Sequence, residues 1–314
     1  MSPAHPDLVV VIGYGDELPV FRQARALWQF YAGHFPGIDF LFYRWTRDLK
    51  RGEVVHNGHD LLVGVGGDFD GDAGYAASGV WSQSENAKWV FRQVLVQDHL
   101  LRTRDRPFYM YHTTATSVVD FRGLLTAMAA LPATDCFAGP IARLNGPEEL
   151  AGVTFVSGAS VLFSSDNLAR MRERYVPHHP FAGLPNDVWQ ALMLHDVPRI
   201  ALPSFNFLRE RAPRGDAAAI SALTRQMLAQ GHYHFRVKTV APQDAAGRRE
   251  DIDPWIMLRI METILDHEHV PAAVQAQIGR YQQWVGNGAA RIPPRTPAPL
   301  YQGPGEVALN DTDL

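Results

Sequence analysis

Short apolar runs alternate with amphipathic segments along the first two thirds of the chain. Leu8 to Ile12 is a continuous apolar run before Gly13-Tyr14-Gly15, and Ile38 to Tyr43 is a second run of this kind. Between them, Pro19 to Tyr31 carries apolar residues at intervals of three and four. Continuous runs are typical of buried parallel strands, and the three-four spacing is typical of an amphipathic helix. The pattern therefore predicts a strand, helix, strand unit with a right-handed crossover.

The same alternation continues beyond this unit. Further extended segments are predicted at Leu61–Val65, Phe108–Met110, Phe137–Ile141, Thr154–Phe163, Ile200–Phe207 and Gly231–Thr239. Helices are predicted at Ser84–Leu101, Phe121–Leu131, Ser165–Tyr175, Val188–His195, Ile252–His267 and Pro271–Val285. This order predicts an α/β protein with a mixed, mainly parallel sheet and helices on both faces. We expect one domain over residues 1–240, a helical segment packed on it over 241–290, and a Pro- and Gly-rich tail with little order over 291–314.

The central stretch, Phe108 to Asp120, reads FYMYHTTATSVVD. A strand that is buried through its apolar positions opens here onto small hydroxylated residues, among them Thr116 and Ser117. Strand ends of this kind are places where an open α/β sheet can seat a ligand. A Thr-rich turn that leads into a helix N-cap is the alternative interpretation, and the residues of this stretch alone do not decide between them.

Composition narrows the class of protein. The 314 residues are 46% hydrophobic and 20% charged, with a formal net charge of −4, which argues against nucleic acid as a partner. The single cysteine, Cys136, forms no internal disulfide and indicates a reducing compartment. No run approaches the ~18 apolar residues of a membrane span, and the first residues lack a signal-peptide pattern. We therefore expect a cytoplasmic protein without a transmembrane segment; its oligomeric state is not indicated.

Two motifs suggest ligands that the surrounding residues do not support. Gly13 and Gly15 fit part of a dinucleotide-binding turn, but the third glycine and the acidic end of the second strand are missing. The Asp-rich segment Asp68–Asp72 resembles a calcium loop, yet the twelfth position is Gly79 and the sixth is Ala73. We interpret the second segment as a solvated turn.

Several polar residues are candidates for chemistry. On a strand, His232, His234 and Arg236 share one face, and two imidazoles at this spacing can grip a phosphate or a metal ion. An ordinary polar strand face is the alternative. Asp187 precedes an apolar helical pattern, so it is a candidate helix cap.

Taken in series, these segments resemble the β-1,3-galactosyltransferase and fringe-like family of glycosyltransferases, which have the GT-A fold. The matching segments are Gly67-Asp68-Phe69-Asp70, Tyr75, Lys88, Met110–Asp120, Phe155–Ser164 and Asn186-Asp187-Val188. The resemblance covers about Leu8 to Phe207 and rests on the order and spacing of these pieces. It departs at the family's metal-binding acidic triplet, where Ala115, Thr116 and Ser117 stand here.

The resemblance implies a hexosyltransferase-like enzyme that moves a sugar, with inversion, from a nucleotide-sugar donor to a saccharide or glycoconjugate acceptor, as in polysaccharide biosynthesis. Without carboxylates at the triplet we expect no divalent metal cofactor there. The residues expected to serve are Asp187 as general base, Thr116, Ser117, Lys88, His232, His234 and Arg236 on the donor side, and Ser157, Gly158 and Ala159 on the acceptor side. A noncatalytic nucleotide- or saccharide-binding protein of the same fold is the alternative.

Overall fold

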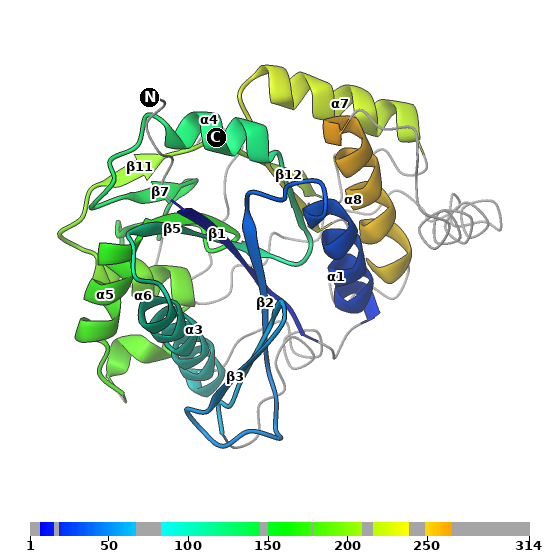
Figure 1. The fold of residues 1–314 in the computed structure, drawn as a ribbon. Helices are drawn as coiled ribbons and strands as arrows, with labels where there is room; N and C mark the ends of the chain where they lie inside the picture. The colour runs from blue at the N-terminus through cyan, green and yellow to red at the C-terminus, as the bar shows by residue number, and fades with distance from the viewer. Residues whose placement is uncertain are drawn as a thin grey trace.

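The described residues of this computed structural model are 7–15, 19–66, 83–144, 150–177, 179–208, 216–238 and 249–265. They form a mixed α/β fold in which helices lie on both faces of a large, mostly parallel sheet (Figure 1). This architecture confirms the predicted mixed, mainly parallel α/β sheet and is compatible with a Rossmann-like fold.

The central sheet contains eight strands. Their order across the sheet is β11 (Arg199–Ala201), β7 (Phe137–Gly139), β10 (Ser160–Ser164), β5 (Phe108–Thr114), β1 (Asp7–Gly13), β2 (Asp39–Trp45), β4 (Asp60–Val63) and β3 (Val54–Asn57). The four strands β5, β1, β2 and β4 form a parallel core. In contrast, β10 is antiparallel to both of its neighbours, and β3 is antiparallel to β4.

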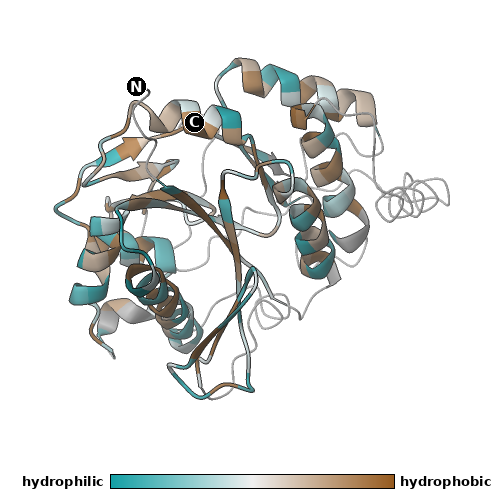
Figure 2. Cartoon of the chain, in the orientation of Figure 1, coloured by the Kyte–Doolittle hydropathy of each residue, from teal (hydrophilic) through white to brown (hydrophobic). Residues whose placement is uncertain are grey.

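Alternate side chains of each central strand pack against helices on opposite faces. Val10 and Ile12 belong to the core beneath one set of helices, and Val9 and Val11 belong to the core beneath the other. The first set comprises α1 (Pro19–Ala32), α4 (Phe121–Met128), α7 (Ala217–Ala229) and α8 (Arg249–Leu265). The second set comprises α3 (Gln83–Thr103), α5 (Ser165–Arg174) and α6 (Asn186–Met193). Figure 2 shows the resulting apolar sheet between partly polar helices.

Two smaller sheets complete the described fold. One has the order β12 (Ser204–Leu208), β13 (His234–Lys238), β6 (Ser117–Val119), and the other pairs β8 (Ile141–Arg143) with β9 (Thr154–Val156). Because only two residues separate β6 from β5, the pairing of β6 with β13 brings the late histidine segment to the carboxyl end of β5.

Several predicted strands are broken or shortened in the structure, among them Phe137–Ile141, which divides at Pro140 into β7 and β8 of different sheets. Thr154–Phe163 is not continuous: β9 and β10 belong to different sheets and are joined by a turn at Ser157–Ala159. Ile200–Phe207 likewise divides into β11 and β12 on either side of a proline. The strand predicted from Gly231 begins only at His234, so His232 is not on it.

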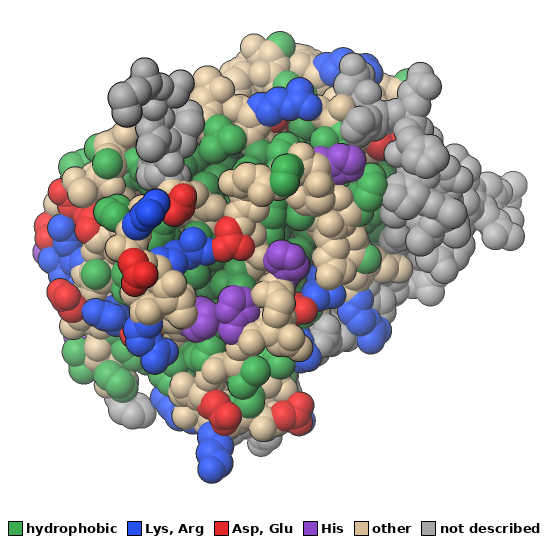
Figure 3. All heavy atoms as spheres, in the orientation of Figure 1, with side chains coloured by type: hydrophobic (Ala, Val, Ile, Leu, Met, Phe, Trp, Pro, Cys, Tyr) green, Lys and Arg blue, Asp and Glu red, His purple; other side chains and the backbone are tan. Residues whose placement is uncertain are grey.

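Other expectations fall outside the described residues. These are the Asp68–Asp72 segment, Tyr75, the Pro271–Val285 helix and the tail over 291–314. Within the described part of the chain, none of the helices combines the length and apolar character needed to cross a membrane. On the face drawn in Figure 3, acidic and basic side chains are mixed rather than gathered by sign.

Candidate functional site

The strand order reverses at the carboxyl ends of β1 and β5, which makes this edge of the sheet the candidate place for a ligand-binding crevice. The chain leaves β1 toward β2 on one side, and β5 lies on the other side of β1. In open α/β sheets, ligands bind where the strand order reverses in this way. The two strand ends are tied together, because the Ala115 amide donates to the Gly13 carbonyl at 3.1 Å. The Trp28 indole of α1 donates to the Ala115 carbonyl at 3.0 Å.

Thr116 and Ser117, predicted on the donor side, lie at this edge but are enclosed. Thr116 is 5% exposed and Ser117 is 0% exposed. The Ser117 hydroxyl is 2.9 Å from the Thr114 hydroxyl, and the Thr116 carbonyl accepts from the Val237 amide. The two residues therefore shape the bend between β5 and β6 and present few free polar atoms.

The predicted acceptor residues form the turn at Ser157–Ala159, which runs beside the same edge. Ser160, the first residue of β10, pairs with Thr113 near the end of β5. The Thr113 hydroxyl donates to the Ala159 carbonyl at 2.8 Å. The small side chains let this turn lie against both β5 and the start of α6.

Asp187 lies directly against this turn, 29 residues from Gly158 in sequence. One carboxylate oxygen, Oδ2, is 3.4 Å from the Gly158 amide, and Oδ1 accepts from the Val188 amide at 3.0 Å. A Cβ added to Gly158 would lie 3.2 Å from Asn186 Oδ1, so glycine suits the close approach. The structure thus brings the predicted base and the predicted acceptor turn together.

The alternative interpretation, in which Asp187 is the N-cap of α6, is wrong. The cap position is Pro185, which provides no side-chain hydrogen bond. Asp187 stands in the first helical turn, where a carboxylate is stabilised by the positive end of the helix dipole and by unpaired amides.

His234 is buried and both of its ring nitrogens have partners. Nδ1 is 2.6 Å from the Ser204 hydroxyl, and Nε2 is 3.5 Å from the Thr113 hydroxyl. Burial lowers the pKa of His234 to about 3, so its ring is neutral near pH 7. His234 therefore supports the turn from the side of Ala159 and offers no free nitrogen for the predicted phosphate contact.

The remaining donor-side predictions do not converge as closely. His232 precedes β13 and is half-buried beside Phe205, and burial lowers its pKa. Arg236 is half-buried on β13 and pairs in register with Ser117. Lys88 lies half-buried in the second turn of α3, on the other face of the central sheet.

Sequence reasoning missed a second histidine that supports the same turn. His112 lies on β5, with Nδ1 2.9 Å from the Gly158 carbonyl and Nε2 2.7 Å from the Tyr43 hydroxyl. A carbonyl only accepts, so Nδ1 carries the proton and Nε2 accepts from Tyr43. Burial lowers the pKa of His112 to about 4, which keeps this ring neutral as well.

Gly13 makes the Tyr43–His112 contact possible. The two partners lie on β2 and β5, on either side of β1, and Gly13 pairs with Tyr43 in register. A Cβ at Gly13 would lie 2.9 Å from the Tyr43 hydroxyl and 3.0 Å from its Cζ. The glycine that resembled part of a dinucleotide motif thus has a packing role here: it lets the phenol cross β1.

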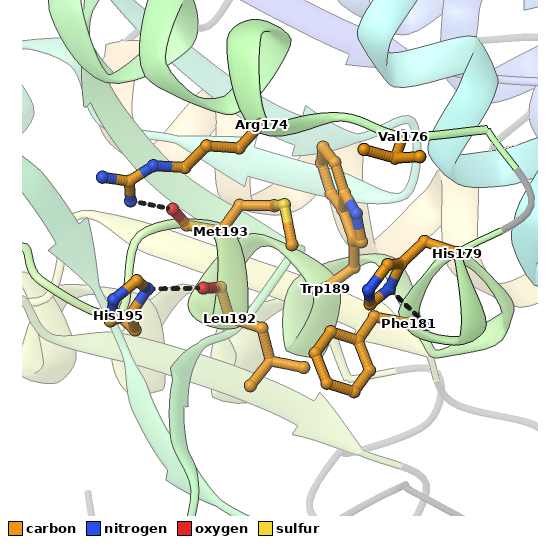
Figure 4. Close-up of a pocket in the computed structure, with 8 residues that line it drawn as sticks. All are labelled: Arg174, Val176, His179, Phe181, Trp189, Leu192, Met193 and His195. Carbon is orange, nitrogen blue, oxygen red and sulfur yellow. Dashed lines mark hydrogen bonds between the residues drawn. The ribbon is translucent and has the colours of Figure 1, made fainter.

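A separate hollow of about 300 Å³ lies on another side of α6 (Figure 4). It is lined by Trp189, Leu192 and Met193 of α6, by His195 after α6, and by residues from Arg174 at the end of α5 to Phe181. Residues 187 and 189 of a helix point about 200° apart. The hollow is therefore distinct from the Asp187 side chain and its contact with Gly158.

No cluster of three or more His, Cys, Asp or Glu side chains suited to a metal ion occurs in the ranges that the structure describes. Comparison with models of known protein families found no match, and comparison with curated proteins found no significant relative. The function must therefore be argued from the site itself.

Proposed function

We propose that this protein is an inverting glycosyltransferase of GT-A type, which transfers a sugar from a nucleotide-sugar donor to a saccharide or glycoconjugate acceptor. The observation that carries the proposal is the contact of Asp187 with the Ser157–Ala159 turn at the carboxyl edge of the sheet. A carboxylate, a small-residue turn and a strand-order crevice meet there, as the resemblance in sequence leads one to expect.

Asp187 is the general base of this proposed reaction. The acceptor hydroxyl lies along the Ser157–Ala159 turn and gives its proton to the carboxylate as its oxygen attacks the anomeric carbon. The bond from that carbon to the diphosphate oxygen breaks, and the nucleoside diphosphate leaves with the electron pair. Attack from the face opposite to the leaving group inverts the anomeric centre.

The leaving diphosphate needs positive charge or hydrogen bonds to stabilise it. On the proposed donor side, Lys88, His232 and Arg236 are the candidates with half-buried rather than enclosed side chains. Thr116, Ser117 and His234 shape the crevice in this scheme. Since Ala115-Thr116-Ser117 provides no carboxylate, we propose that donor binding does not require a divalent cation.

The test begins with a panel of nucleotide sugars, screened for thermal stabilisation and then for donor consumption with mixed saccharide acceptors. Asp187→Asn removes the proton acceptor but keeps the size of the side chain. A general base contributes roughly 10²- to 10⁴-fold, so transfer should fall by that factor while donor affinity and melting temperature hold.

Asp166→Asn is the matched control, because Asp166 also lies in the first turn of a helix, α5, and also accepts from a backbone amide. Transfer by this variant should equal that of the wild type. Retention of more than about a tenth of wild-type transfer by Asp187→Asn would exclude Asp187 as the base. Donor binding with neither transfer nor hydrolysis would indicate the noncatalytic binding protein instead.

A further inference from the structure

Among the residues that the structure describes, Arg92 is a buried cation without a counter-charge. It lies on α3 and is 1% exposed, and its Nε and Nη2 atoms are enclosed with no hydrogen-bond partner in that part of the chain. Its guanidinium carbon lies 3.3 Å from the ring centre of Trp89 and 4.8 Å from that of Tyr43. Aromatic rings attract a cation through their faces but do not neutralise it.

Such an arrangement is costly unless something else binds to the cation. A buried ion loses its hydration, and the penalty reaches several kcal/mol when no partner replaces the water. Two other arginines of the described part of the chain show the usual arrangement: Arg25 pairs with Asp60, and Arg249 pairs with the buried Asp253. Arg92 has no such ion pair there, so its burial calls for another explanation.

The α3 residue that follows Arg92 also has an enclosed polar atom without a partner in the described part of the chain. Gln190 of α6 donates to Gln93 Oε1 at 2.7 Å, but among the described residues Gln93 Nε2 and Gln190 Oε1 have no partner. Both side-chain polar atoms of the fully buried Gln97, further along α3, also lack partners there. Buried amides normally find partners, so these atoms are available to a bound polar group.

Arg92 is linked through Tyr43 to the edge of the sheet where the strand order reverses. Tyr43, whose ring faces Arg92, pairs in register with Gly13, the last residue of β1. The Tyr43 hydroxyl continues to His112 and, through it, to Gly158 beside Asp187. Gln190 lies one helical turn after Asp187 on α6. Arg92 and Asp187 therefore lie at opposite ends of one polar network beside the strand-order reversal.

We propose that Arg92 is the positive group of an anion subsite that takes a phosphate or diphosphate group, with Gln93 Nε2 as a second donor. The planar guanidinium fork matches two phosphate oxygens at once, which a lysine cannot reproduce. The identity of the occupant rests on the proposed function: it is the diphosphate of the sugar donor, and Arg92 stabilises it as the leaving group.

The first test measures the binding of pyrophosphate to the full-length protein by titration calorimetry. Charge-assisted contacts of this kind correspond to about 10- to 100-fold in affinity, so Arg92→Gln should weaken binding by that factor. Arg92→Lys should recover part of the loss. Arg122→Gln, which changes an exposed arginine of α4 on the other face of the sheet, should bind as the wild type does.

A second measurement separates a ligand-binding arginine from a structural one. Without anion, Arg92→Met replaces an unpaired buried charge by an apolar chain of similar length, so its urea midpoint should rise. Pyrophosphate should then raise the midpoint of the wild type and leave that of Arg92→Met unchanged. A lower midpoint for Arg92→Met, with no effect of pyrophosphate on either protein, would show that Arg92 is structural and overturn the proposal.

The outcomes distinguish this subsite from the proposed reaction. Pyrophosphate binding that depends on Arg92, in a protein that consumes no nucleotide sugar, would support the subsite and refute the glycosyltransferase. Sugar transfer that depends on Asp187, with pyrophosphate affinity indifferent to Arg92→Gln, would refute the subsite alone.

Discussion

Lowering the pH should destabilise this protein already at pH values above those at which carboxylates titrate, because two buried histidines stay neutral in the folded state. Burial lowers the pKa of His112 to about 4 and that of His234 to about 3, against about 6.5 in an unfolded chain. Both rings hold the Ser157–Ala159 turn, His112 through the Gly158 carbonyl and His234 through Thr113.

The stability of the fold decreases with falling pH because the unfolded chain takes up protons that the folded protein does not. Between pH 6.5 and pH 4 the unfolded chain binds a proton at each histidine while the folded protein does not, so stability falls as pH falls. At pH 5, which is 1.5 units below the unfolded value, each histidine costs about 2 kcal/mol at 1.36 kcal/mol per unit. Together they remove about 4 kcal/mol, a large share of a typical folding free energy of 5–15 kcal/mol.

Urea unfolding at pH 7.5, 6 and 5 measures this loss. The wild type should lose about 4 kcal/mol across the range, and His112→Gln or His234→Gln should each lose about 2 kcal/mol less than the wild type. Burial raises the pKa of Asp120, which acts in the opposite direction, but this contribution cancels between wild type and variant. His195→Gln, at an exposed position, is the control. If both buried-site variants showed the full wild-type loss, the reasoning would be refuted.

Two further predictions concern the crevice. Gly13→Ala should lower the free energy of unfolding by about 2 kcal/mol, because its Cβ would press the Tyr43 hydroxyl away from His112; an unchanged urea midpoint would contradict this. Donor affinity should change by less than about tenfold, or 1.4 kcal/mol, when a chelator is added, since Ala115-Thr116-Ser117 lacks carboxylates; a larger loss in calorimetry would require a metal site elsewhere.

The elements predicted best from the sequence are those with a clear apolar pattern, either continuous or at helical spacing. The continuous apolar run of β1 and the three-four spacing of α1 give boundaries within a residue or two of those observed. The edge strand β3, Val54–Asn57, was missed because it is largely exposed and carries no apolar pattern. The α7 helix was missed as well, since only Ile220, Thr224 and Met227 mark its buried side.

The candidate site could be predicted only in part, and that part came from the family resemblance rather than from the hydropathy pattern. Asp187 and the Ser157–Ala159 turn were identified through segments whose spacing resembled a family, and the structure places them in contact. The Tyr43–Gly13–His112 contact joins three strands, and their order across the sheet is not encoded by local hydropathy. His234 was identified, but its burial depends on the pairing of β13 with β6, which is likewise nonlocal.

The neutrality of the two histidines has a consequence for the proposed base. A positive charge beside a carboxylate favours its ionised form and makes it a weaker proton acceptor. His112 holds the Gly158 carbonyl and His234 supports Thr113, which donates to the Ala159 carbonyl, yet burial keeps both rings uncharged near pH 7. In the proposed scheme, the charge that a leaving diphosphate needs comes instead from Arg92, beyond Tyr43. The network thus anchors the acceptor turn with hydrogen bonds alone and separates the proton acceptor from the cation, as the proposed chemistry requires.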